Sequence, residues 1–129
     1  MRIAQVAPLY EAVPPQAYGA TKCVVHSLTE ALVWCGHHVT LFATADSTTS
    51  AEHIPLCPRG LWRDANVWDT LAHHVRELEV VAQRAARSDV IHFHGDSLRF
   101  PVARRLACAH VTTMHGRLLA VDHGPLLRY

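Results

Sequence analysis

The sequence has no excess of charge of either sign. Its 12 lysines and arginines balance 11 acidic residues, giving a net charge of +1 with the histidines neutral. A balanced surface creates no broad positive field, so we expect no nucleic-acid partner. Apolar runs are too short to span a bilayer, and residues 1–6 do not resemble a signal peptide. These absences predict a cytoplasmic protein.

Cysteine pairs at redox or metal spacing are also missing. The four cysteines, none in a C-x-x-C motif, are Cys23, Cys35, Cys57 and Cys108. Cys23 and Cys35 fall on one expected helix, roughly 18 Å apart from the helical rise, so they cannot bond to each other. We expect buried free thiols in a reducing compartment.

The 11 histidines show no zinc-finger spacing with the cysteines. The adjacent pairs His37-His38 and His73-His74 do not share a helix or strand face. We therefore predict no metal site, and the alternative is a metal hydrolase built on His92, His94 and His115. Neither G-x-G-x-x-G, a P-loop nor a nucleophile elbow occurs, which argues against a nicotinamide enzyme, a P-loop nucleotidase and an α/β-hydrolase.

What the sequence does contain is a regular alternation of apolar strands and helices. Half of the residues are apolar and 18% are charged, as expected for one folded domain over residues 1–129. We expect strands at 2–7, 38–43, 52–56, 90–94 and 109–113, and helices at 21–35, 66–87 and 97–107. This order predicts an α/β fold, a Rossmann-like doubly wound parallel sheet with strand order 3-2-1-4-5.

Two helices carry apolar stripes that should face the sheet. Thr21 is the expected N-cap of the first helix and Gly36 its stop. The expected stripe of the first helix is Val24, Val25, Leu28, Leu32 and Cys35. That of the second is Val67, Leu71, Val75, Leu78 and Ala82.

The strand ending in His92-Phe93-His94 is the centre of the expected site. Alternation places His92 and His94 on the same face, with His94 at the carboxyl end. In doubly wound sheets ligands bind beyond the carboxyl ends of the strands, where the strand order reverses. The loop with Gly19, the turn after His94 and the turn with His115 should therefore converge on one crevice.

Each of these residues has a functional and a plain structural interpretation. Around Gly19 and Ala20, small residues at a helix start favour a phosphate, although a simple glycine loop is an equal alternative. A neutral His94 imidazole can both donate to and accept from a sugar hydroxyl. Asp96 either orients His94 or caps the next helix, and we favour the cap. For Glu11, solvation is favoured over contact with an acceptor.

The ordered set of motifs resembles the amino-terminal domain of family-4 glycosyltransferases. It comprises Ile3-Ala4-Gln5-Val6-Ala7-Pro8, Tyr18-Gly19-Ala20-Thr21, Gly36-His37-His38-Val39-Thr40-Leu41-Phe42, Asp89-Val90-Ile91-His92-Phe93-His94 and Thr112-Thr113-Met114-His115-Gly116. The resemblance implies half of a GT-B fold and hexose transfer, with retention, from a UDP- or GDP-linked nucleotide sugar to a sugar or lipid acceptor. It implies no bound metal or other cofactor, and it allows peripheral membrane contact in a full-length form.

By this resemblance Gly19 and Ala20 approach the donor diphosphate, His94 lies against the transferred sugar as the catalytic residue, and His115 lines the same cleft. Two features depart from the family pattern. Ala20 replaces a second glycine, which would be strained at positive φ, and Lys22 replaces an acid. The donor-binding carboxyl-terminal domain is also absent from the sequence, so we expect the isolated chain to be inactive. The alternatives are a non-catalytic binding or assembly module that self-associates through an exposed sheet edge, or half of a split enzyme.

Overall fold

Five parallel strands form one sheet in the order β3-β2-β1-β4-β5, as predicted. In this computed structural model, which describes residues 1–16 and 19–116, the strands are β1 (Arg2–Val6), β2 (His38–Ala43), β3 (Glu52–Pro55), β4 (Val90–His94) and β5 (Ala109–Thr113). β1 pairs with β4 from Ile3 opposite Val90 to Val6 opposite Phe93. The strand order therefore reverses between β1 and β4, where a doubly wound sheet forms its ligand crevice.

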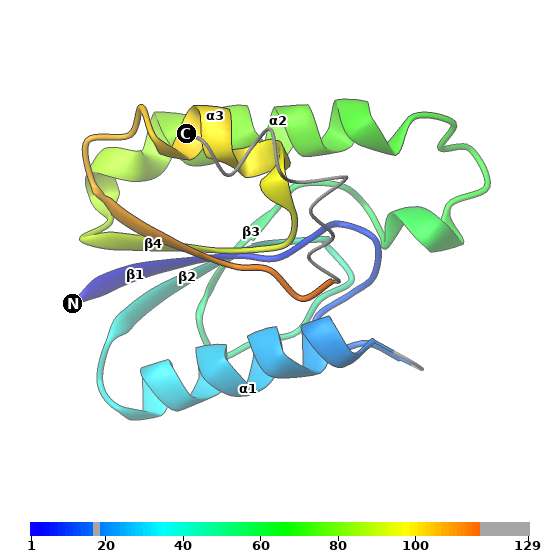
Figure 1. Ribbon diagram of the computed structural model, residues 1–129. Helices are drawn as coiled ribbons and strands as arrows, with labels where there is room; N and C mark the ends of the chain where they lie inside the picture. The colour runs from blue at the N-terminus through cyan, green and yellow to red at the C-terminus, as the bar shows by residue number, and fades with distance from the viewer. Residues whose placement is uncertain (17–18, 117–129) are drawn as a thin grey trace.

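Helices cover both faces of this sheet (Figure 1). The long helix α1 (Ala20–Trp34) lies on one face, and α2 (Thr70–Arg84) and the short α3 (Phe100–Ala103) lie on the other. Single 3-10 turns occur at η1 (Leu61–Arg63), η2 (Ala85–Arg87) and η3 (Ser97–Arg99). The predicted start of α2 at Asn66 is wrong because Asp69 caps the helix, accepting from the Leu71 and Ala72 N–H groups.

The core is larger on the α2 side of the sheet than on the α1 side. On the α2 side, side chains from β1, β2 and β4 pack with helical residues, among them Val6, Phe42, Phe93, Leu78 and Val81. The α1 side buries a smaller cluster of Ala7, Val13, Val25, Leu41 and Ala43.

The expected apolar stripe of α1 is mostly wrong. Val25 is buried, but Val24 and Cys35 are exposed, and the buried face of the helix is completed by Lys22 and Thr29. Leu28 and Leu32 are only partly buried. Gly19, not Thr21, is the N-cap residue, and it offers no side chain to the first turn. A stripe chosen only by hydrophobicity overlooks polar residues that the fold buries for other reasons.

The expected stripe of α2 is also rotated from the observed one. Leu71 and Val75 are each 54% exposed, whereas His74 and Glu77 are buried beside Leu78. The His74 ring is satisfied on both sides: Nε2 accepts from the Leu9 N–H at 3.3 Å, and Nδ1 donates to the Thr70 carbonyl at 2.8 Å. Burial of a polar side chain is tolerated when its hydrogen bonds are made.

The thiols are free but not uniformly buried. Cys57 is buried, Cys108 is half-buried, and Cys23 and Cys35 are exposed, so the expectation of four buried thiols is wrong for two of them. Cys23 lies on the exposed side of α1, and Cys35, which the expected stripe had placed inward, is the exposed C-cap residue of that helix. In the part of the chain that the structure describes, no helix has the length and apolar character needed to cross a bilayer.

Candidate functional site

A cavity of about 280 Å³ opens at the carboxyl edge of the sheet, where the sequence predicted a crevice. Its wall brings together the segment after β1, the first turn of α1, the turn after β4 and the residues after β5. Thr21, Lys22, Gly95, His115 and Gly116 line it. The expected convergence of three loops therefore occurs, with the helix turn rather than Gly19 itself at the wall.

A hydrogen-bonded chain of three side chains lies beneath this cavity. His94 Nε2 is 2.6 Å from Gln5 Oε1, and His94 Nδ1 is 3.1 Å from His115 Nε2. Because the Gln5 oxygen can only accept, His94 donates from Nε2, and its Nδ1 in the neutral ring accepts from His115. Both nitrogens of His94 are therefore engaged, and His115 carries the polar group that reaches the cavity.

His94 is held in its neutral form. It is 1% exposed, and burial lowers the pKa of its imidazole to about 3, with smaller contributions from His92, His115 and Arg99. The His92 ring lies tilted against the His94 ring, with 4.0 Å between centroids, and its Nε2 is 2.8 Å from Thr113 Oγ1. The predicted same-face placement of His92 and His94 is confirmed. The neutral His94 ring can accept a hydrogen bond but takes up a proton poorly at neutral pH.

Gly19 and Ala20 lie next to the cavity rather than at its wall. A Cβ at Gly19 would lie 2.7 Å from Glu11 Oε2 and 2.8 Å from Pro15 Cβ, so close packing favours glycine there. Ala20 begins α1, and among the described residues only glycines have positive φ, so the strain expected at Ala20 does not occur. Tyr18 of the same motif lies outside the described residues.

Lys22 is the most unusual cation of the site. It is the only lysine in the sequence, yet it is 5% exposed and lines the cavity from the first turn of α1. Its ammonium lies 5.7 Å from the centre of the Tyr10 ring. Burial lowers the pKa of Lys22, while the Glu11 carboxylate opposes that shift. A partly desolvated ammonium beside uncapped helix N–H groups favours an anion.

A buried ion pair supports the turn after β4, and sequence analysis missed it. Arg99 Nη2 lies 3.0 Å from Glu77 Oε2, with both side chains almost fully buried, and Arg99 Nη1 lies 3.3 Å from Asp96 Oδ1. Burial raises the pKa of Glu77 to about 7, and the Arg99 guanidinium opposes the rise. Asp96 also accepts from the Leu98 N–H, so its predicted cap role is confirmed. Residues 22 apart in sequence gave no local signal of this pair.

An aromatic wall completes the cavity. Trp62 stacks on Tyr10 with 5.1 Å between ring centroids and is 69% exposed. The Leu61 and Trp62 N–H groups bind the Leu9 and Tyr10 carbonyls at 2.9 and 3.1 Å, which fixes η1 against the segment after β1. An exposed aromatic face held by backbone hydrogen bonds is suited to packing on a ligand ring.

His92, His94 and His115 are arranged as hydrogen-bond partners of neighbouring side chains. Within residues 1–16 and 19–116, no three histidine, cysteine or acidic side chains are grouped so that they could hold a metal ion. The metal-hydrolase alternative on His92, His94 and His115 therefore finds no supporting geometry, since His94 Nδ1 and His115 Nε2 already bind each other.

Comparison with solved structures gives an informative similarity. No protein-family model and no curated protein matches the sequence. Among solved structures, the chain is similar to AviGT4, a glycosyltransferase involved in avilamycin A biosynthesis, with a TM-score of 0.58 and 26% sequence identity. The match covers 89% of this chain and 32% of AviGT4, so the chain spans about a third of that protein. The α/β fold described above thus matches half of a GT-B glycosyltransferase.

Proposed function

We propose that this chain is the acceptor-side half of a retaining, nucleotide-sugar-dependent glycosyltransferase that transfers a hexose to a carbohydrate or lipid acceptor. The observation that carries the proposal is the similarity to AviGT4 over 89% of the chain. The crevice at the β1–β4 switch supports it, because this is where ligands bind in doubly wound sheets. Because the chain spans about a third of AviGT4, we expect the 129 residues alone to bind substrate without turnover.

We assign the donor diphosphate to the start of α1. Gly19 leaves the first-turn N–H groups without a side-chain cap, and Lys22 adds a cation at the cavity wall. An oxyanion there accepts hydrogen bonds from the backbone and is stabilised by the helix dipole. In this proposal Gly19 and Ala20 allow the diphosphate of a UDP- or GDP-linked sugar to approach the backbone.

We place the transferred sugar against His94 and His115. A sugar hydroxyl that displaces His115 Nε2 would donate to His94 Nδ1, while Gln5 keeps the other nitrogen in place. The exposed face of Trp62 offers packing area for a sugar ring on the acceptor side. The chain would thus contribute positioning and stabilisation of the departing diphosphate, without a covalent intermediate on the protein.

The test is nucleotide binding to the 129-residue chain, measured by titration calorimetry with UDP, GDP and their hexose derivatives. Replacing Lys22→Met should weaken binding about tenfold or more, since a hydrogen bond to a charged group contributes about 1.5 to 3 kcal/mol. Arg59→Met, at an exposed residue that does not line the cavity, is the control and should leave the affinity unchanged. Absence of saturable binding, or equal affinity of the Lys22→Met variant, would overturn the proposal.

The edge strand β5 favours a second candidate, an assembly module. Among the described residues β5 pairs only with β4, and its residues Ala109, His110 and Val111 are exposed. An open edge with a β-branched side chain is a site for pairing with another chain. A stable dimer in light scattering that Val111→Lys disrupts would support this candidate, and a monomer with intact nucleotide binding would favour the transferase half.

A further inference from the structure

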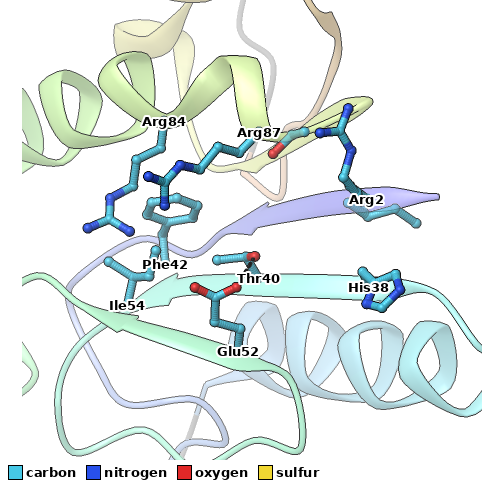
Figure 2. A pocket seen from close by; sticks show the side chains of 10 residues that line it. Arg2, His38, Thr40, Phe42, Glu52, Ile54, Arg84 and Arg87 are labelled. Carbon is cyan, nitrogen blue, oxygen red and sulfur yellow. Dashed lines mark hydrogen bonds between the residues drawn. The ribbon is translucent and has the colours of Figure 1, made fainter.

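A second cavity lies at the opposite edge of the sheet, near the amino ends of the strands. Its volume is about 350 Å³, and it lies between the end of α2 and the surface of β2 and β3. Figure 2 shows Arg84 and Arg87 reaching from the helical end toward Phe42, Ile54 and Glu52 on the sheet. The strands thus separate this cavity from the cavity at the carboxyl edge that His115 and Lys22 line, which we call the histidine crevice.

Two guanidinium groups of this cavity have no anionic partner among the described residues. Arg84 and Arg87 make no ion pair there, whereas the nearby Arg2 is bound to Asp89 at 2.6 Å. Arg84 belongs to the last turn of α2 and Arg87 to η2, so both come from ordered helical backbone. Guanidinium groups carried on ordered backbone are well suited to bind phosphate oxygens through paired hydrogen bonds.

The wall opposite the arginines offers different chemistry. Glu52 on the edge strand β3 and Thr40 on β2 lie side by side, with Thr40 Oγ1 donating to Glu52 Oε2 at 3.2 Å. The second carboxylate oxygen of Glu52 makes no hydrogen bond with a described residue. Between the two polar walls lie the apolar side chains of Phe42 and Ile54.

We propose that this cavity binds a sugar phosphate, meaning a phosphate monoester with neighbouring hydroxyl groups. The phosphate lies on Arg84 and Arg87, the hydroxyls donate to Glu52, and the C–H face of the sugar packs on Ile54 and Phe42. A plain inorganic anion would leave the second carboxylate oxygen of Glu52 without a ligand hydroxyl to bind. The two arginine charges outweigh the single charge of Glu52, so the cavity still favours an anionic ligand. The volume is at the small end of ligand pockets, which suits a phosphorylated monosaccharide better than a dinucleotide.

The experiment compares three probes on the 129-residue chain by titration calorimetry and amide chemical-shift mapping: glucose 6-phosphate, inorganic phosphate and glucose. We expect the order of affinity to follow this sequence, with shifted resonances around residues 38–42, 52–54 and 84–88. Arg84→Gln and Arg87→Gln should each reduce the affinity for glucose 6-phosphate about tenfold, as the loss of one charge-assisted contact implies. Arg105→Gln, at an exposed arginine outside the cavity, is the control.

Glu52→Gln separates this proposal from a general anion patch. It should reduce the advantage of glucose 6-phosphate over inorganic phosphate without weakening phosphate itself. Equal affinity of the two anions in the unmodified chain, no saturable binding, or unchanged affinity in the Arg84→Gln/Arg87→Gln double variant would overturn the proposal. Lys22→Met should not change this binding, so failure here and failure of the nucleotide test are distinguishable.

Discussion

The guanidinium of Arg99 lies directly over the backbone of Gly95, where any side chain would stand. A Cβ built at Gly95 would overlap Arg99 Nη1 and lie 2.8 Å from Arg99 Cζ. Arg99 is itself held by Glu77 and cannot turn into solvent, because it is 1% exposed. The turn that ends the histidine strand is therefore fixed by a buried cation on its inner side.

Replacing Gly95→Ala should therefore destabilise the fold by roughly 2 to 3 kcal/mol, combining unfavourable φ with the overlap. Two other glycines act as controls measured in the same urea titration. Gly36 has φ of +84° but open space, so its alanine variant should lose only about 1 kcal/mol. Gly116→Ala meets nothing within 4 Å and should be close to neutral. Equal losses of unfolding free energy in the Gly95→Ala and Gly36→Ala variants would show that the Arg99 side chain moves aside at little cost.

Removing one member of the buried Glu77–Arg99 ion pair should lower the free energy of unfolding more than replacing both members. Glu77→Gln removes the buried partner of Arg99 and leaves only the exposed Asp96 carboxylate beside its charge, so we expect a loss of roughly 3 to 5 kcal/mol in the free energy of unfolding. The double variant Glu77→Leu/Arg99→Met removes both charges and should recover much of that loss. If the double variant is less stable than Glu77→Gln, the specific contact between Glu77 and Arg99 stabilises the turn, and not only the absence of an unbalanced buried charge.

His94 should make the fold sensitive to acid. Its pKa falls from an ordinary value of 6.5 to about 3 in the folded chain, so between these values the unfolded chain binds a proton that the folded chain does not. The stabilisation is complete above pH 6.5 and is lost as pH falls toward 3, with a slope of about 1.4 kcal/mol per pH unit. His94→Gln, which can still donate to Gln5, should reduce this slope in chemical denaturation, whereas His110→Gln on the exposed part of β5 should not.

The four thiols should react in a fixed order with a chromogenic disulfide reagent. Cys23 and Cys35 are exposed and should react within the first phase. Cys57 should react last, because burial raises the pKa of its thiol to about 11 and its Sγ donates to the Arg59 carbonyl at 3.3 Å. Mass spectrometry of the partly labelled chain assigns the order. Early labelling of Cys57 would mean that the loop after β3 opens readily.

Strand order and histidine placement could be read from the sequence because they depend on strong local signals. Alternation along the His92-Phe93-His94 strand and the alternation of strands with helices leave few topologies for a parallel sheet. The carboxyl-edge crevice followed from that topology. The prediction that His94 is catalytic and that Gly19, Ala20 and His115 bind the donor stays a prediction.

The predictions of which faces of α1 and α2 are buried were wrong for a physical reason that Lys22 and Glu77 illustrate. Both are long charged side chains, which are almost never fully buried unless paired, so an amphipathic pattern places them outside. Each is buried here by partners distant in sequence: Arg99 for Glu77, and the Tyr10 ring with Glu11 for Lys22. Such long-range compensation leaves no trace in the periodicity of a single helix.

The burial of the sole lysine has a practical consequence for anyone handling the folded chain. In the 129-residue chain used for the binding tests, with Lys22 enclosed, the amine that faces solvent is that of Met1, which is 64% exposed and precedes β1 at the far edge of the sheet from the crevice. Amine coupling under native conditions should therefore attach the molecule to a surface through one point and in one orientation. The histidine crevice would then face the solution in every copy, a uniform array ready for ligand measurements.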